Sequence, residues 1–585
     1  MPQATSTAVL YTQAQALQFL QDQPHAKRLY PLTPNALAAV LDHTQLPVLS
    51  PLTVVSDRAQ QQLVDRVRQA ESAVWPQICD APDLSVAGKT VFRNKFHVFT
   101  CSVFYLYEVL RGTGPWLIHD GQTWHPIEDL NHAVELLFQY VYDRGYGAFS
   151  ISIGSNQRGK MLLQMLNFIL ITCFIKPRCI WLTGYEYNLK ALSAEIPASE
   201  KGISVLFPGV ANGKSVCRTL KTLSEQFFPR RHSKSAVEYV PVLSPKQDYR
   251  EFFSKTLASS QVFKSPLIEK ACINFTNTHV SYTEALIPHL ESLFQRIKPE
   301  RVIAHHLRWM AAPALAQVAQ SQDIDCTLIS HGSHGVPENP TAQYAQDHLA
   351  DGLLVSALAT ETITQSPVAE QAASKLAPTL KRRRSSPLMW GHEVPPPDCQ
   401  KDVFTILQAG TYKVLGGRPW IYETSSEFVH GLQQLVQAIQ GIEHIHLIIR
   451  VREEPQECTL SALKQLLPET PNWELSTTGY FRDDLQRSDM LISFSSTTLE
   501  EALFARRPVG LFGGSSRYRH LAGMAELPSP ERRSAVYHLN ANTLRGMLCR
   551  VAEVHINQPL SDEELRPYVW GRDVPGWQNF VNELV

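Results

Sequence analysis

The sequence lacks any closely spaced pair of cysteines. None of its ten cysteines forms a Cys-x-x-Cys pair, and none is grouped with histidines. Disulfide frameworks and zinc sites in sequences of this kind require such groupings, so the pattern argues against both and indicates a reducing compartment. The ten cysteines are Cys79, Cys101, Cys173, Cys179, Cys217, Cys272, Cys326, Cys399, Cys458 and Cys549.

The chain also lacks an excess of charge of either sign. Its 54 Lys and Arg residues nearly balance 55 Asp and Glu residues, which leaves a formal net charge of -1. A balanced chain has no general electrostatic attraction for polyanions, so we expect no nucleic-acid partner. The hydrophobic fraction of 44% and the charged fraction of 19% are those of an ordinary globular protein.

No apolar run is long enough to cross a membrane. The longest, MLLQMLNFILITCFI at 161–175, contains Gln164 and Asn167 and is shorter than the ~20 residues that a spanning helix needs. It is typical of a buried core helix, and docking on a membrane surface is the alternative. The first residues show no basic segment followed by an apolar core, as a signal peptide would. We therefore expect a cytoplasmic protein, with peripheral attachment to the inner face of the plasma membrane as the alternative.

The length of 585 residues exceeds what one hydrophobic core accommodates, so two or more domains are expected. We predict an N-terminal Rossmann-like domain at 1–345 that carries a helical insert at about 75–230. A C-terminal Rossmann-like domain follows at 346–555, and closing helices occupy 556–585. A Pro-, Ser- and Arg-rich loop at 367–402 is predicted near the start of the second domain, and its basic run KRRR is predicted to be a solvated surface.

The clearest unit of the first half lies at 281–332. The segment SYTEALIPHLESLFQRI has apolar residues at helical spacing and is followed by the short strand RVIAHH. A second helix, MAAPALAQVAQSQ, precedes the strand DCTLIS, which ends at His331 and Gly332. Strand, helix and strand within about 30 residues form a βαβ unit, which predicts a parallel sheet.

The same alternation resumes after residue 403. Four short apolar runs, VFTILQ, HLIIRV, DMLISF and PVGLF, alternate with helical segments such as SSEFVHGLQQLVQAIQ. The sequence thus predicts the α/β class, with two doubly wound parallel-sheet domains that face a cleft. The apolar positions expected on the buried face of the helix after VFTILQ are Phe428, Val429, Leu432, Leu435, Val436 and Ile439.

Polar residues follow the predicted strands of the second half, where open parallel sheets bind their ligands. They are Gly410, Thr411, Arg450, Arg452, Ser495, Ser496, Thr497 and Thr498. Hydroxyls at the start of a helix favour phosphate, because the free backbone N–H groups and the helix dipole attract an anion. An arginine from a neighbouring strand end can add a charge-assisted contact. The pattern predicts a nucleotide site.

Two simpler interpretations stay open at this point. The Ser-Ser-Thr-Thr run can serve only to cap the helix, with Thr498 and Glu501 as a capping box. The two arginines can pair with Glu453 or Glu454 at the surface.

The run SFSSTTLEEALFARRPVGLF resembles the donor-binding segment of GT-B glycosyltransferases and of UDP-N-acetylglucosamine 2-epimerases. The segment from 301 to 332 resembles the last βαβ unit of the N-terminal domain in bacterial capsule and surface-carbohydrate transferases. The resemblance implies phosphate contacts from Ser496 and Thr497, a ribose contact from Glu501, and a cleft position for His331 and Gly332. The stretch LIIRVREEP resembles the position where many relatives have a His-Pro or an Arg-rich phosphate contact, and this chain has Arg-Val-Arg and no His-Pro there.

An inverting transferase needs a base close to the acceptor hydroxyl. His331 is the first candidate, and His305, His306 and His334 also follow strands of the first half. No metal and no cofactor is expected, because the Asp-x-Asp at 323–325 precedes a strand, at the wrong end for the cleft.

The resulting hypothesis is a glycosyltransferase of surface-polysaccharide biosynthesis, for example of a capsule. Its partners would be a UDP- or CMP-linked sugar and a glycan or lipid-linked acceptor. A sugar-nucleotide 2-epimerase or a CDP-glycerol-type transferase of the same fold is the alternative. A non-catalytic glycan-assembly scaffold is the alternative of another class.

Overall fold

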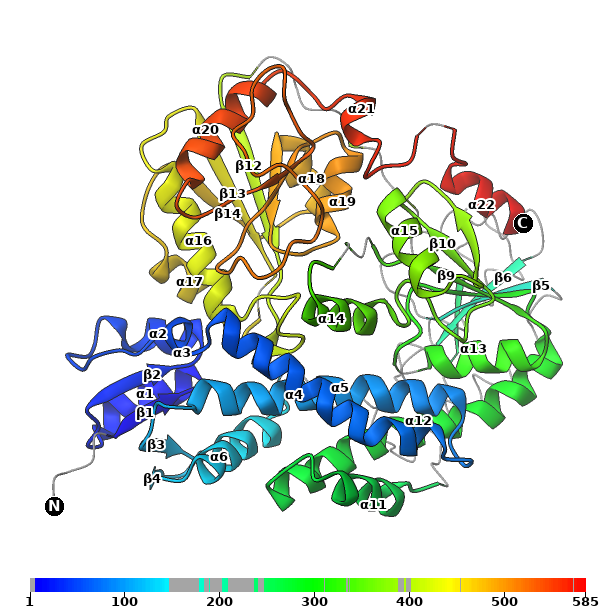
Figure 1. The fold of residues 1–585 in the computed structure, drawn as a ribbon, viewed down its shortest axis with the longest axis horizontal. Helices are drawn as coiled ribbons and strands as arrows, with labels where there is room; N and C mark the ends of the chain where they lie inside the picture. Colours follow the sequence, from blue (N-terminus) through cyan, green and yellow to red (C-terminus); the bar gives the residue numbers. More distant parts are fainter. Residues whose placement is uncertain are drawn as a thin grey trace, which may run out of the picture.

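The described residues form three sheets, two of them entirely parallel (Figure 1). The apolar run at 161–175, His334 and most of the predicted insert beyond residue 146 lie outside the residues described. The computed structural model describes residues 6–146, 178–183, 189, 203–208, 236–239, 247–309, 311–332, 335, 337–387, 394–395, 401–452, 454–571 and 573–584.

The first sheet is small and lies at the N-terminus. Its strand order is β2 (Arg28–Pro31), β1 (Thr7–Leu10), β3 (Trp116–His119) and β4 (Trp124–Ile127). Only β4 runs antiparallel to its neighbour. Two helices pack their apolar residues on one face, and α6 packs on the other. The helices around this sheet are α1 (Gln13–Asp22), α2 (Pro34–Leu41), α3 (Pro51–Val54) and α6 (Leu130–Asp143).

A layer of long helices connects this small sheet to the first parallel sheet, and Figure 1 shows α4, α5 and α12 running beside one another. Helix α5 has apolar residues around its whole circumference, which predicts burial on all sides, and phenylalanines from four other segments pack around it. The helices of this layer are α4 (Asp57–Cys79), α5 (Val86–Leu110), α11 (Arg250–Ser260) and α12 (Pro266–Ile297).

The first parallel sheet has seven strands. Every neighbouring pair in it is parallel. Helix α13 (Ala312–Ser321) crosses between β8 and β9, which confirms the predicted βαβ unit. The strand order is β11 (Lys381–Arg384), β10 (Glu361–Thr364), β9 (Asp325–Ile329), β8 (Arg301–Ala304), β5 (Arg178–Leu182), β6 (Ile203–Pro208) and β7 (Ala236–Tyr239).

The structure differs from the predicted domain boundaries in two places. Strands β5 and β6 fall within the predicted insert at 75–230, yet they belong to the first parallel sheet. Strands β10 and β11 lie beyond the predicted boundary at 345 and extend that same sheet past β9. The pairing partners of these short strands are far away along the chain, so local periodicity could not assign them to a sheet.

The basic run KRRR also differs from the prediction of a solvated loop. It forms edge strand β11, and its side chains meet carboxylates. Arg383 lies 2.5 Å from Glu583, and Lys381 lies 3.4 Å from the buried carboxylate of Glu361. Charged side chains on an edge strand also discourage pairing with another chain.

The second parallel sheet has six strands. Side chains alternate between its faces, so adjacent residues of one strand contribute to different cores. Ile406 packs with α16 and α20, whereas Leu407 packs with α19. This alternation is that of a doubly wound sheet, as predicted. The strand order is β14 (Trp473–Ser476), β13 (Ile445–Val451), β12 (Phe404–Gly410), β15 (Met490–Ser493), β16 (Val509–Leu511) and β17 (Val536–His538).

Helix α16 illustrates why the sequence folds as it does here. Thr424 and Glu427 form a capping box at its start, and all six predicted apolar positions are buried. The helices around this sheet are α16 (Ser425–Ile439), α17 (Leu460–Leu466), α18 (Phe481–Arg487), α19 (Thr498–Phe504) and α20 (Leu544–His555).

The C-terminal segment returns from the second sheet to the first (Figure 1). After α21 (Asp562–Leu565), Trp570 donates to the carbonyl of Thr364 in β10, and α22 (Trp577–Leu584) lies against β11 through Arg383 and Glu583. Within the described part of the chain, no helix combines the length and the apolar character needed to cross a membrane.

Replacing either of two helical glycines by alanine should change the stability of the protein, in opposite directions for the two. A Cβ at Gly431 in α16 would lie 2.8 Å from the backbone nitrogen of Gly514, whereas a Cβ at Gly546 in α20 would meet nothing within 4 Å. We expect Gly546→Ala to stabilise the protein by ~0.5–1 kcal/mol, because alanine favours a helix. Gly431→Ala should destabilise it by ~1–3 kcal/mol, because the Gly513–Gly514 turn has to move. Urea denaturation measures both, and equal shifts would contradict this packing.

Candidate functional site

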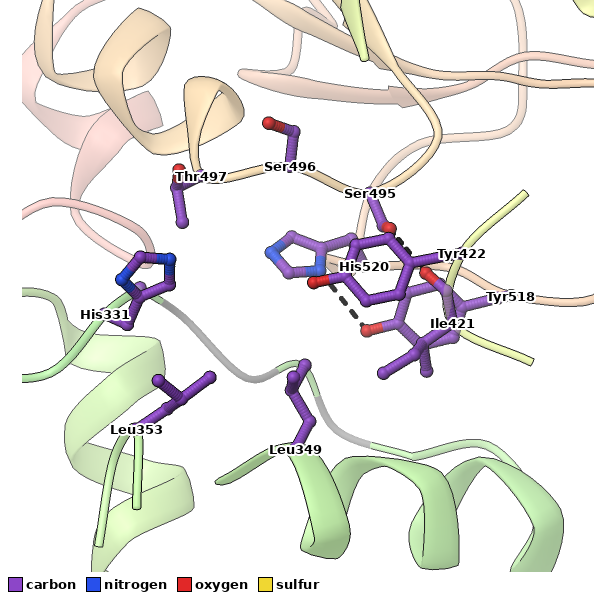
Figure 2. Close-up of a pocket in the computed structure, with 11 residues that line it drawn as sticks. His331, Leu349, Leu353, Ile421, Tyr422, Ser495, Ser496, Thr497, Tyr518 and His520 are labelled. Atoms are coloured by element: carbon purple, nitrogen blue, oxygen red, sulfur yellow. Dashed lines mark hydrogen bonds between the residues drawn. The ribbon is translucent and has the colours of Figure 1, made fainter. Parts of the chain in front are cut away.

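A pocket lies where the first and second parallel sheets approach each other (Figure 2). It encloses about 390 Å³ of empty space, part of it open to solvent. Figure 2 shows the Ser495–Thr497 segment along one side, opposite the two leucines. The lining residues are His331, Gly332, Leu349, Leu353, Ile421, Tyr422, Ser495, Ser496, Thr497, Tyr518 and His520.

The turn from β15 to α19 supplies three hydroxyls to this lining. Ser495 is buried, and its hydroxyl donates to the carbonyl of Ile421, so it anchors the neighbouring segment. Ser496 and Thr497 are half-buried. Thr497 precedes the helix without capping it through its side chain, so the capping box predicted for Thr498 and Glu501 does not form. Ser496 and Thr497 both line the pocket, and the hydroxyl of Ser496 accepts from the backbone N–H of Thr498 at 3.3 Å.

The first sheet reaches the pocket through the end of β9. The backbone N–H of His331 donates to the carbonyl of Leu353 at 2.9 Å. A Cβ on Gly332 would lie 2.6 Å from Cγ2 of Thr497, and the residue has φ +155. Only glycine allows this approach. The backbone after β9 of the first sheet therefore lies against the Ser495–Thr497 turn of the second.

A buried arginine fixes the position of a segment that forms another wall of the pocket. Arg517 donates to the carbonyls of Pro419, Trp420 and Tyr422, and both terminal nitrogens contact the carboxylate of Glu427 at 2.5 and 3.0 Å. Its side chain is completely buried. Since a buried guanidinium requires such partners, the segment that carries Ile421 and Tyr422 has one defined position.

Two further lining residues are linked to each other. The Tyr518 hydroxyl lies 3.2 Å from Nδ1 of His520 and also accepts from Gln346 of α14 (Pro340–Ala350) at 3.2 Å. Burial lowers the pKa of His520 to about 4, so this imidazole is neutral at neutral pH. It acts in the pocket as a hydrogen-bonding group and carries no charge.

Neither predicted arginine lines the pocket. Arg450 lies 2.5 Å from Asp484 and donates to the carbonyl of Gly479 at 2.9 Å. Arg452 is exposed. The strand order explains the difference, because β12 separates β13 from β15 and carries the arginines to another part of the sheet edge. An ion pair at the surface with Glu453 or Glu454 was one interpretation of these arginines; Arg450 instead pairs with the buried Asp484.

The other predicted donor residues lie beside the pocket. The Thr498 hydroxyl donates to the carbonyl of Ala409 at 3.3 Å, which brings the end of β12, with Gly410 and Thr411, next to the start of α19. Glu501 is one turn into α19 and does not line the pocket. Burial, together with the charge of Glu500, raises the pKa of Glu501 to about 8.

The alternative histidines lie deeper than His331. His305 and His306 follow β8, and both are buried. The rings of His305 and His331 are 6.3 Å apart between centroids. Asp323 adopts a left-handed turn conformation with φ 55, and Asp325 pairs with Arg301 at 3.5 Å, so both have structural surroundings at the opposite end of β9.

Sequence reasoning missed six lining residues: Leu349, Leu353, Ile421, Tyr422, Tyr518 and His520. None of the six directly follows a strand that the sequence predicts. Tyr518 and His520 follow β16 by several residues, so a longer window after each strand would have included them. Leu349 and Ile421 belong to segments that reach the pocket only through tertiary packing.

No protein-family model and no curated protein matches this sequence. Several solved structures align with it at low identity. The UDP-GlcNAc 2-epimerase from Neisseria meningitidis bound to UDP-GlcNAc is 14% identical, with a TM-score of 0.38 over 69% of this chain and 98% of that chain. MurG of Acinetobacter baumannii is 10% identical, with a TM-score of 0.38 over 70% and 98%. The glycosyltransferase SnogD from Streptomyces nogalater is 13% identical, with a TM-score of 0.36 over 70% and 98%.

These TM-scores are below 0.5, so the alignments decide nothing about activity. The chain's own topology confirms the predicted α/β class, with two parallel Rossmann-like sheets that border the pocket.

The carboxyl group of Glu423 makes the structure around the pocket sensitive to pH. It is buried beside Tyr422 and accepts from the backbone of Gly514 at 2.8 Å. Burial is the main cause that raises its pKa to about 8, and the nearby Glu427 carboxylate adds to it. Because the folded pKa lies above the unfolded value of ~4.3, this group stabilises the fold at low pH. That contribution is lost as the pH rises towards 8.

We therefore expect Glu423→Gln, which carries no charge at any pH, to gain stability relative to the unchanged protein by on the order of 3–5 kcal/mol between pH 5 and pH 9. Urea unfolding at pH 5, 7 and 9 measures this difference. Parallel curves for the two proteins would show that Glu423 is not held protonated.

Proposed function

We propose that this protein is a glycosyltransferase that moves a sugar from a nucleotide-sugar donor to a glycan or lipid-linked acceptor in surface-polysaccharide biosynthesis. The observation that carries the proposal is the contact of Gly332 with Thr497, which sets His331 of the first sheet beside the hydroxyls of the second in one pocket. In open parallel sheets, ligands bind at such strand ends. A donor held by one sheet would present its sugar to groups from the other.

The donor phosphates would bind at Ser496 and Thr497. Their hydroxyls are half-buried and line the pocket, and hydrogen bonds from such groups to an anion are stronger than those between neutral groups. Since Arg450 is occupied by Asp484, the positive charge would come from Lys413, whose Nζ lies 4.6 Å from the ring centroid of the lining residue Tyr422. Developing charge on the leaving phosphate would then meet preset donors and a cation.

His331 would act on the acceptor. It lines the pocket from the first sheet, near the position that a donor sugar would occupy if its phosphates contacted Thr497. A neutral imidazole can take the proton from an attacking hydroxyl. The N-terminal half would supply the acceptor surface, and attachment at the membrane would bring a lipid-linked acceptor to it.

Thermal unfolding in the presence of nucleotides tests the donor site. A ligand at 100 times its dissociation constant adds ~2.7 kcal/mol of stability, so one member of a panel of UDP, CMP, CDP, GDP and their sugar conjugates should raise the melting temperature. The double variant Ser496→Ala/Thr497→Val should bind that nucleotide at least about tenfold more weakly, because each lost hydrogen bond to a charged group costs ~1.5–3 kcal/mol.

Ser374→Ala is the matched control, because this exposed hydroxyl bonds only to the carbonyl of Gln371 in α15 (Pro367–Leu376). A shift that both variants retain would place the nucleotide elsewhere. No shift with any nucleotide would favour the scaffold. Conversion of a UDP-sugar without any acceptor would identify an epimerase, and a shift confined to CDP-glycerol would identify a glycerol-phosphate transferase.

A further inference from the structure

A second group of chemically capable side chains lies outside the pocket, in the helical layer. Glu71 of α4, His97 of α5 and His348 of α14 converge there, and each offers a ligand atom within 4.8 Å of the other two. All three side chains are more than nine-tenths buried. They come from three helices, and Figure 1 shows α14 lying over α4 and α5.

The carboxylate of Glu71 is oriented by its surroundings. Its Oε2 accepts from the hydroxyl of Tyr344 at 2.5 Å, which leaves Oε1 directed at the two imidazoles. Oε1 lies 3.1 Å from Nδ1 of His97 and 3.0 Å from Nε2 of His348. Atoms that bind one zinc ion at ~2.0–2.2 Å are separated by similar distances, so this carboxylate oxygen already has the required spacing from each nitrogen. The two rings stack with centroids 3.6 Å apart, so one ring has to turn for both nitrogens to reach the same ion.

The two histidines differ in their remaining contacts. Nε2 of His97 meets the thiol of Cys101 at 3.6 Å, a partner that fixes the ring with Nδ1 towards Glu71. Neither nitrogen of His348 makes a hydrogen bond. Its Nε2 lies close to the carboxylate of Glu71, but this contact lacks the alignment that an N–H donor needs. Buried polar atoms rarely stay without a partner, and a lone pair aimed at a cation would satisfy this one.

We propose that Glu71, His97 and His348 bind one divalent transition-metal ion of the zinc class. Two imidazoles and one carboxylate form a ligand set that zinc uses, with a fourth position left for water. Tyr344 and Cys101 form the outer shell that holds the ligands in place. The ion ties α4 and α5 to α14, and the residue after His348 is Leu349, which lines the pocket. The site is structural and lies apart from the proposed donor site, so it stands or falls independently of it.

This proposal goes against the expectation of no metal. The expectation rested on cysteine spacing and on the place of the Asp-x-Asp at 323–325, whereas these ligands are 26 and 251 residues apart in the chain and contain no cysteine. Only the packing of the three helices brings them together.

Metal analysis of the full-length, untagged protein tests the site. After removal of metal with a chelator and dialysis, the protein should take up one Zn²⁺ per chain by mass spectrometry of the bound metal. With Co²⁺ it should give visible absorption of a four- or five-coordinate site with nitrogen and oxygen ligands. His348→Gln should abolish this uptake, and Zn²⁺ should raise the melting temperature of the unchanged protein but not that of His348→Gln.

His555→Gln is the matched control, because His555 is also a buried histidine and bonds to a tyrosine hydroxyl, that of Tyr537, at 2.8 Å. It should bind Zn²⁺ as the unchanged protein does. Tyr344→Phe keeps all three ligands and remains informative if His348→Gln fails to fold; it should weaken Zn²⁺ binding by roughly 10–100-fold. Failure of the unchanged protein to bind Zn²⁺ or Co²⁺, or equal uptake by His348→Gln and His555→Gln, would overturn the proposal.

Discussion

The arrangement of the pocket depends on one buried ion pair. Arg517 follows the second parallel sheet, and its guanidinium is enclosed by Glu427 at the start of α16 and by three carbonyls of the segment from Pro419 to Tyr422. A charge in such a position is tolerated only when all its hydrogen bonds are made. The pair therefore fixes the segment that carries Ile421 and Tyr422 relative to the helix and to the strand ends.

The same region joins the second sheet to the helical layer. Arg517 lies 3.5 Å from Asp57 at the start of α4, and the hydroxyl of Ser515 donates to the same carboxylate at 2.8 Å. Further from the pocket, Tyr11 donates to the buried Glu457 at 2.6 Å. These polar contacts, together with the apolar cluster of Val64, Ala342, Trp420, Ile421, Phe494 and Tyr518, join the parts of the protein here. Such contacts allow one docking arrangement, which a pocket built from several segments requires.

Segments that lie far apart in the sequence therefore form the pocket together. The first sheet contributes His331 and Gly332, the second contributes the turn after β15, and α14 contributes Leu349. Helix α14 also carries His348, directly before the lining residue Leu349. The proposed metal site and the proposed donor site therefore share one helix. An ion that restrains α14 would restrain one wall of the pocket.

Local sequence determined the parts of this protein that depend on neighbours along the chain. The period of apolar residues predicted α16, the βαβ unit around α13 and the four central strands of the second sheet, because each buries a face that repeats within a few residues. The turn from Ser495 to Thr497 and the pair His331–Gly332 were found for the same reason: each directly follows a buried strand. Tertiary structure alone decided the rest. Arg450 is bound by Asp484 because β13 lies two strands away from β15, and Tyr422, His520 and the Glu71–His97–His348 cluster gather residues that only the packing of distant segments makes neighbours.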